Sequence, residues 1–261
     1  KVKFVPLTAK ERFTALQSGE IDMLSRNTTW TITRDASLGL NFAGVNYYDG
    51  QGFMVKSSLG VSSAMELSGA AICIQAGTTT ELNLADWGKA NGIEYNSVVS
   101  DTNAQTLTNY DAGRCDVLTT DASGLYSMRA GANDPSEHVV LPEIISKEPL
   151  GPVVRQGDDQ WFNIVRWSLN AMITAEEIGV NSGNVDDVSN NPERERLMGR
   201  SGSTHEYVGL NPDWTYQIIK QVGNYSESFE RNIGLNTPIG IARGVNALWS
   251  DGGILYSAPF R

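Results

Sequence analysis

The stretch from Arg26 to Arg34 concentrates side chains that bind small anions. It reads RNTTWTITR and follows an apolar run, residues 21–25, that we predict to be a strand. A guanidinium such as that of Arg34 presents a planar fork of donors to a carboxylate, and Thr29 and Thr31 add hydroxyls on one side of an extended chain. The stretch therefore predicts an anion site, although a strand end whose threonines cap the following turn would look the same.

A second stretch with the same chemistry begins at Gly77. It reads GTTTE, follows a short apolar strand expected over residues 70–75, and opens a helix that we expect to run toward Gly92. The first N–H groups of a helix have no partner within the helix and point, with the helix dipole, toward a bound anion. The alternative interpretation is ordinary N-capping by Thr78.

The elements that must position these residues occur as a repeated unit of helix, glycine, two residues, aspartate and strand. In the first copy a capping box, Thr8 to Glu11, opens a helix that ends at Gly19 and leads to the strand at 21–25. The second copy runs through residues 109–116 into a strand at 117–120 that ends at Asp121. Open α/β sheets bind ligands at the carboxyl ends of their parallel strands, so two copies predict two lobes with a site at these ends.

The rest of the chain predicts connections and helices. We expect a strand at residues 1–7, chain crossings at 46–52 and 147–152, a long amphipathic helix at 158–178, and shorter helices that include residues 207–223 and 239–249. No phosphate-binding loop, Gly-x-Ser-x-Gly elbow or cysteine beside a histidine occurs. The sequence contains no catalytic signature that we recognise.

Composition excludes several classes of partner. The 261 residues carry a formal net charge of -10 with no run of Lys and Arg, which argues against nucleic acid or an anionic membrane surface as a partner. The two histidines, His138 and His205, and the two cysteines, Cys73 and Cys115, lie at no spacing typical of a metal site. We expect no metal and no cofactor, and composition leaves both free thiols and a disulfide open.

Together these motifs resemble the amino-acid-binding proteins of bacterial ABC importers, and within them the general L-amino-acid binding proteins. The resemblance covers essentially the whole chain and includes NTTWT from Asn27, NYYDGQGF from Asn46, ISKEPLG from Ile145 and QGDDQW from Gln156. It implies an α/β chain with the type II periplasmic binding protein fold, in which two α/β lobes enclose a ligand cleft. Lobe 1 would comprise residues 1–47 and 152–261, lobe 2 residues 48–151, and the first strand and helix of lobe 1 would be missing.

Matched residue by residue, the resemblance also implies roles for side chains. Arg34 and Thr29 would hold the ligand α-carboxylate from the first lobe, Thr78 and Thr79 would hold it from the second, and Asp121 would accept the α-ammonium group. In many relatives the carboxylate-binding arginine lies at the position that Ala36 occupies in this chain. The match to Arg34 instead follows relatives that bind acidic amino acids. The side-chain pocket would be lined by four further residues: Arg12, Trp30, Tyr47 and Glu148.

The resemblance further implies a monomeric periplasmic protein that captures free L-amino acids by hinge closure and delivers them to an ABC permease in the inner membrane. In that compartment we expect Cys73 and Cys115, each near the start of a strand of lobe 2, to form a disulfide. Two alternatives remain. One is an enzyme on the same fold, such as a dehydratase of a cyclic carboxylate with Glu148 as general acid. The other is the ligand-sensing domain of a receptor.

Overall fold

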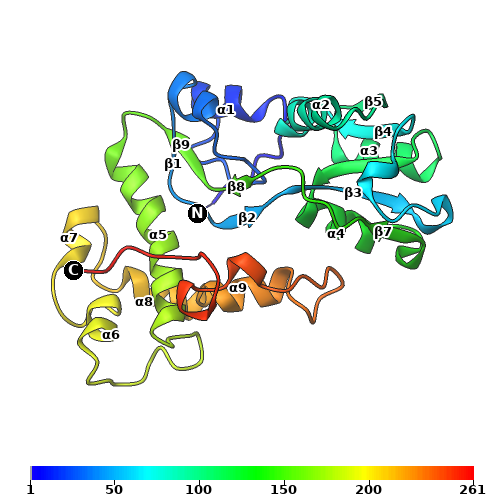
Figure 1. The fold of residues 1–261 in the computed structure, drawn as a ribbon. Coiled ribbons are helices and arrows are strands. Elements are labelled where there is room, and N and C mark those ends of the chain that lie inside the picture. The colour runs from blue at the N-terminus through cyan, green and yellow to red at the C-terminus, as the bar shows by residue number, and fades with distance from the viewer. Residues whose placement is uncertain (1) are drawn as a thin grey trace. The chain divides into compact units, whose positions relative to one another are not determined.

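The computed structural model describes residues 2–261, and the chain forms two compact units (Figure 1). The first unit contains the residues up to Leu40 together with Tyr47–Gly151, and the second contains Asn41–Asn46 together with Pro152–Arg261. The division into lobes at residues 47 and 151 stays a prediction.

The first unit is built on a five-stranded mixed sheet in the order β5-β4-β6-β3-β7. β4 is parallel to both β5 and β6, whereas β3 is antiparallel to β6 and β7. The strands are β3 (Gln51–Lys56), β4 (Ala71–Gln75), β5 (Asn96–Ser100), β6 (Val117–Asp121) and β7 (His138–Val140). The parallel strands therefore deliver Gln75, Ser100 and Asp121 to one edge of the sheet.

Alternation along the strands gives this sheet two buried faces. Phe53, Ile72 and Val117 belong to one apolar cluster, and their chain neighbours Met54, Cys73 and Leu118 belong to another. Helix α2 (Thr79–Asn91) contributes Leu84 to the first cluster, while α3 (Asn103–Asp111) and α4 (Ala122–Ala130) contribute Tyr110 and Leu125 to the second. Helices thus cover both faces, as nearly continuous apolar strands require.

The two expected crossings form a ribbon of their own. β2 (Tyr47–Asp49) pairs antiparallel with β8 (Glu148–Leu150), and Asp49 lies opposite Glu148. These two short strands bring the two carboxylates to the same level of the ribbon.

Before Leu40 lies the α-helix α1 (Arg12–Ser18), which confirms the helix predicted there. Thr8 N and Glu11 N each donate to the other residue's side chain, as a capping box requires, and Gly19 ends the helix with φ of 81°. The strands predicted at 1–7 and 21–25 are wrong: residues 2–7 are irregular, and 21–25 hold only an isolated bridge at Leu24. Neither segment is a strand of the sheets formed by the described residues, and a run of strand composition becomes a strand only where it pairs over several residues. Lys1 lies outside the described residues.

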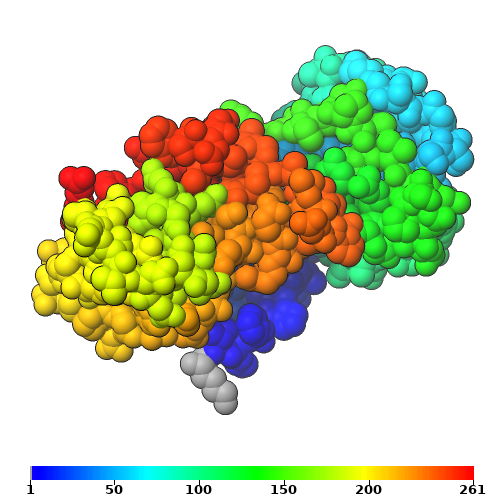
Figure 2. All heavy atoms as spheres, turned by 90° about the horizontal axis from the view of Figure 1, so that it is seen from below, coloured from blue at the N-terminus to red at the C-terminus, as the bar shows by residue number. Residues whose placement is uncertain are grey.

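The second unit is mainly helical, and its later segments are yellow to red in Figure 2. β1 (Leu40–Phe42) pairs with β9 (Val153–Arg155), and the long helix α5 (Asp159–Glu177) confirms the amphipathic helix predicted from residue 158. The shorter helices are α6 (Pro192–Leu197), α7 (Thr204–Val208), α8 (Trp214–Val222) and α9 (Tyr225–Asn232).

Two sequence predictions in this unit need correction. The helix expected at 207–223 is two helices, because Gly209 ends α7 with φ of 66° before α8 begins. The helix expected at 239–249 is absent from the described chain apart from a 3-10 turn, Gly244–Asn246, and the first residue of another, Trp249–Asp251. Gly240 and Gly244 both adopt positive φ, which a continuous helix does not allow.

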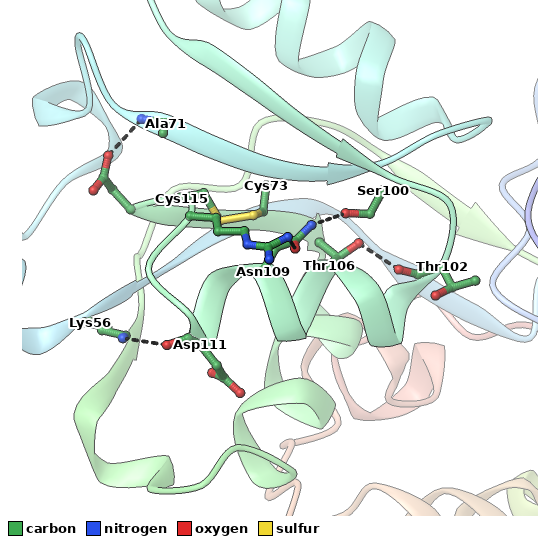
Figure 3. Close-up of a disulfide and its surroundings, with 11 residues drawn as sticks. Lys56, Ala71, Cys73, Ser100, Thr102, Thr106, Asn109, Asp111 and Cys115 are labelled. Atoms are coloured by element: carbon green, nitrogen blue, oxygen red, sulfur yellow. Dashed lines mark hydrogen bonds between the residues drawn. A yellow bond between two sulfur atoms is a disulfide. The ribbon is translucent and has the colours of Figure 1, made fainter.

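Cys73 on β4 and Cys115, just before β6, form the expected disulfide (Figure 3). Their Cα atoms lie 5.6 Å apart. The Asp116 carboxylate accepts the Ala71 N–H at 2.9 Å, and Asn109 Nδ2 donates to Ser100 Oγ at 2.9 Å. The first bond fixes the loop before β6 to β4, which carries Gln75, and the second fixes α3 to the end of β5.

Candidate ligand-binding site

A pocket lies within the first unit, where the segment around α1 meets the carboxyl ends of β4 and β6. It encloses about 410 Å³ of empty space, part of it open to solvent. Its lining contains a single carboxylate and two guanidinium groups among many hydroxyls and amides. The lining residues are Arg12, Arg26, Asn27, Thr29, Gln75, Thr78, Thr79, Thr80, Asn103, Thr120, Asp121 and Gly124.

Asp121 supplies the carboxylate of this pocket. It occupies the N-cap position of α4 but makes no capping hydrogen bond with its side chain. Asp49 takes over that task and accepts the Ser123 N–H at 3.3 Å, while Asn27 Nδ2 donates to Asp121 Oδ2 at 3.2 Å. Burial, with Asp49 and Glu148 nearby, raises the pKa of Asp121 to about 7, so this carboxylate lacks a cationic group that would fully compensate it.

The start of α2 supplies the hydrogen-bond donors. Thr78 is the N-cap residue, yet its hydroxyl donates to the Gln75 carbonyl at 2.8 Å instead of accepting from the helix. The Glu81 carboxylate accepts the Gly77 N–H at 2.8 Å and thereby orders the turn. The interpretation of Thr78 as a side-chain cap is therefore wrong. The first N–H groups of α2 stay available to a bound anion.

Arg12 is the most deeply buried cation of the pocket, with an exposed fraction of 2%. Its Nη1 donates to the Asn27 carbonyl at 2.6 Å, and its Nε has no hydrogen-bond partner among the described residues. Burial and the neighbouring Arg34 and Arg26 lower the pKa of Arg12 to about 9. The Phe13 ring lies 4.8 Å from the guanidinium carbon of Arg12 and 5.1 Å from that of Arg34, a placement that partly offsets their repulsion.

Glu148, predicted to line the side-chain pocket, instead forms a buried hydrogen-bonding centre beside it. Its exposed fraction is 2%, and it is not among the residues that line the pocket. Thr29 and Thr79 donate their hydroxyls to Oε2, while Asn83 and Ser146 donate to Oε1 at 2.6 and 2.7 Å. The Glu148 carboxylate on β8 therefore links Thr29 and Thr79. Each of these two hydroxyls donates its only proton to Glu148.

The structure brings some of the predicted residues into the pocket and leaves others at its margin. Arg12, Thr29, Thr78, Thr79 and Asp121 line it, whereas Arg34, Trp30 and Tyr47 do not. Arg34 lies in a π-helical turn, Thr33–Ser37, and donates to the Thr29 carbonyl at 2.9 Å. Trp30 donates to Asp35 at 3.0 Å, and Tyr47 lies half-buried on β2.

Seven lining residues were missed from the sequence as individual candidates: Arg26, Asn27, Gln75, Thr80, Asn103, Thr120 and Gly124. Gln75 could have been found, because it is the last residue of an expected strand and such positions face the ligand. Asn103 opens α3 and had no such signal. No cluster of His, Cys, Asp and Glu in residues 2–261 could hold a metal ion, and no helix there has the length and apolar character needed to cross a bilayer.

The family of the chain follows from comparison with known proteins. The family model for bacterial extracellular solute-binding proteins, family 3, matches residues 1–181. The chain belongs to this family. The resemblance drawn from the sequence is thereby confirmed, as is the type II periplasmic binding protein fold.

Individual members of this solute-binding family match the full chain. The general L-amino acid-binding periplasmic protein AapJ of Rhizobium johnstonii is 62% identical over 100% of this chain and 78% of its own length. The glutamate/glutamine/aspartate/asparagine-binding protein BztA of Rhodobacter capsulatus is 56% identical over 100% of this chain and 78% of its own length.

Solved structures agree with this assignment. A periplasmic binding protein from Brucella ovis with glutathione bound has a TM-score of 0.98 and 58% identity, covering 100% of this chain and 83% of its own. An ancestral arginine-binding protein has a TM-score of 0.58 and 24% identity over 69% of this chain and 76% of its own, and this match bears on the fold alone.

Proposed function

We propose that this solute-binding protein captures free L-amino acids in the periplasm and delivers them to an ABC permease in the inner membrane. The observation that carries the proposal is Asp121, a carboxylate buried at the end of β6 without a capping role, in a pocket that also holds the start of α2. An α-ammonium group would give Asp121 its missing counter-charge. The names of AapJ and BztA support the same ligand class.

The α-carboxylate would bind at the first N–H groups of α2, beside Thr78 and Thr79 and close to a guanidinium. Arg12 lines the pocket and has an unpartnered Nε, so it is well placed for this contact. The hydroxyls of Thr78 and Thr79 donate to the Gln75 carbonyl and to Glu148, so a contact from either hydroxyl would require a small rearrangement. Arg34 and Thr29 remain proposed carboxylate contacts that would require a small rearrangement, because Arg34 donates to the Thr29 carbonyl and Thr29 donates to Glu148. Hinge closure around the ligand is part of the same proposal.

The proposal includes no chemistry on the ligand. The dehydratase alternative required Glu148 as a general acid above the ligand. Glu148 accepts four hydrogen bonds and does not line the pocket, which favours a role in holding the site together. A group held in this way has no acidic proton directed at a substrate.

Titration calorimetry with all common L-amino acids tests the proposal. We expect at least one to bind with micromolar affinity or better, about -8 kcal/mol. Asp121→Ala should weaken that affinity by a few hundred-fold, because the ligand ammonium would lose its buried partner. Asp86→Ala, on the exposed face of α2, is the matched control and should bind like the native protein. Absence of heat and of any thermal shift across the panel would refute the proposal.

A further inference from the structure

Gly124 lines the ligand pocket from the first turn of α4, just after Asp121. Its φ is not positive, unlike the φ of Gly19 and Gly92, so an L-residue can adopt its backbone conformation without strain. A glycine within a helix also destabilises that helix relative to alanine. Neither the backbone nor the helix therefore explains why this position has no side chain.

The described α-helices contain one other glycine, Gly88 on α2, and packing accounts for it. A Cβ at Gly88 would lie 2.9 Å from the Tyr95 ring and 3.0 Å from the Ile93 carbonyl oxygen, which is backbone. A Cβ at Gly124 would meet only the side chain of Thr120, at 3.1 Å from Cγ2 and 3.8 Å from Oγ1. Thr120 lines the pocket as well, so the space that Gly124 leaves open borders the pocket.

Asp121 and Gly124 are neighbours on this first turn. Asp121 is the N-cap residue, and an N-cap side chain normally reaches the N–H group two or three residues later, so both positions lie on one side of the turn. An ammonium group bound by Asp121 is one bond away from the ligand α-carbon. The ligand side chain therefore begins close to Gly124.

The two faces of the sheet separate the ligand carboxylate from the ligand side chain. α2 covers one face, and its start is the proposed carboxylate site. Thr120 lies on the opposite face, because it follows Leu118 at strand spacing and Leu118 packs with α4. Gly124 on α4 and Asn103 on α3 line the pocket from helices of that same face. With the ammonium at Asp121 and the carboxylate at α2, this uncharged wall is left for the ligand side chain.

We propose that Gly124 determines which side chains the site accepts, because its missing Cβ leaves room beside Asp121 for amino acids larger than alanine. This inference rests on the proposed amino-acid function and adds the residue that sets its size limit. One methyl group in a ligand pocket changes affinity by about 10- to 200-fold. Adding one at Gly124 should therefore shift the preference of the site toward small amino acids.

Gly124→Ala tests this role, alone and together with Thr120→Ser. The serine removes the methyl group nearest to the added Cβ and keeps the hydroxyl. In both cases we expect the tightest amino acid of the calorimetric panel to bind at least about tenfold more weakly, while alanine affinity changes by less than about twofold. The double variant should melt at or above the temperature of Thr120→Ser alone, since alanine is the better helix former.

Gly131→Ala is the matched control on the same helix. Gly131 ends α4 with an ordinary φ of -94°, its added Cβ would lie 3.7 Å from the nearest atoms, and it does not line the pocket. The same substitution at this position should change neither the affinity for the tightest amino acid nor that for alanine.

Several results would overturn the inference and leave the proposed function standing. Native-like binding of the tightest amino acid by Gly124→Ala, or its restoration by Thr120→Ser, would show that the glycine serves only packing against Thr120. Equal weakening of alanine would show that the added methyl disturbs the head of the ligand, and a lower melting temperature of the double variant would assign Gly124 to folding. A native protein that binds alanine or glycine most tightly would leave the space without a use. If no free amino acid binds the native protein, the proposed function itself fails and this inference fails with it.

Discussion

The affinity for an amino acid should depend on pH through Asp121. Burial and the carboxylates of Asp49 and Glu148 raise its pKa to about 7 in the ligand-free protein. Only the ionised carboxylate pairs with an ammonium group, so binding at neutral pH must release a proton from part of the population. The ligand itself stays zwitterionic between pH 6 and 8.

The size of the effect follows from this pKa. The apparent dissociation constant is multiplied by one plus the ratio of protonated to ionised Asp121, which is about 11 at pH 6, about 2 at pH 7 and about 1.1 at pH 8. Affinity should therefore fall about tenfold as the pH falls from 8 to 6. About half a proton should leave per ligand bound at pH 7.

Folding of the ligand-free protein should respond with the opposite sign. Asp121 binds a proton in the folded state up to pH about 7, whereas its ordinary pKa is 3.8. Because the folded state binds more protons in this window, the contribution of Asp121 to stability falls as the pH rises from about 4 to about 7. Thermal melts with and without ligand should show the ligand-induced shift growing over the upper part of that window.

Calorimetry in buffers of different ionisation enthalpy measures both the affinity and the proton release. Asp49→Asn provides a selective variant, since an asparagine oxygen can still accept from the start of α4, while one of the two charges that add to the effect of burial on the Asp121 pKa is gone. In Asp49→Asn the fall in ligand affinity should therefore occur at lower pH than in the native protein. A native dissociation constant that changes by less than about twofold between pH 6 and 8 would refute a pKa near 7 for Asp121 in the ligand-free protein, whereas Asp121→Ala tests its role as the ammonium partner.

Three further predictions concern the support of the site. Gly77→Ala should weaken ligand binding and lower stability by about 1 to 2 kcal/mol, because a Cβ at φ of 74° would also lie 2.9 Å from Lys10 Cγ and 3.4 Å from the Lys10 backbone. Gly92→Ala, at φ of 67° with no atom within 4 Å of the added Cβ, introduces only the backbone strain and should bind the ligand normally. Glu148→Gln should lower stability by about 1 to 3 kcal/mol in denaturant titration, because an amide cannot accept four hydrogen bonds, and unchanged unfolding would contradict the role given to Glu148. Cys73→Ser with Cys115→Ser should cost about 4 kcal/mol for the 42-residue separation in the chain-entropy model, and reductant should destabilise only the native protein.

Much of the fold could be predicted because local signals and tertiary context agree. The alternating strands at 71–75 and 117–121, the helix from Thr79 to Asn91 and the capping box at Thr8 all form as their residue patterns indicate. The disulfide was expected from the periplasmic compartment that the resemblance implies, together with two cysteines near the starts of neighbouring strands. Patterns of this kind are reliable where each strand has a partner to pair with.

The failures have a common cause in contacts between distant parts of the chain. Residues 2–7 and 21–25 have strand composition, but pairing depends on neighbours that the pattern does not specify. Glu148 was recognised as a polar residue near the pocket, yet its role depends on donors at Thr29, Thr79 and Asn83, all far from it in sequence. No local signal shows which of several polar groups will saturate a buried carboxylate.

The two helix starts at the site show how local rules identify a functional position when they are broken. Thr78 and Asp121 are both favoured N-cap types and both occupy N-cap positions, yet neither side chain caps its helix. Glu81 and Asp49 instead accept N–H groups at these turns, which leaves the Asp121 carboxylate available to a ligand cation and the start of α2 available to a ligand anion. Sequences usually satisfy such local preferences, and departures concentrate at functional sites. The paired departure, one end suited to each charge of a zwitterion, is the physical reason to place the amino-acid head between β6 and α2.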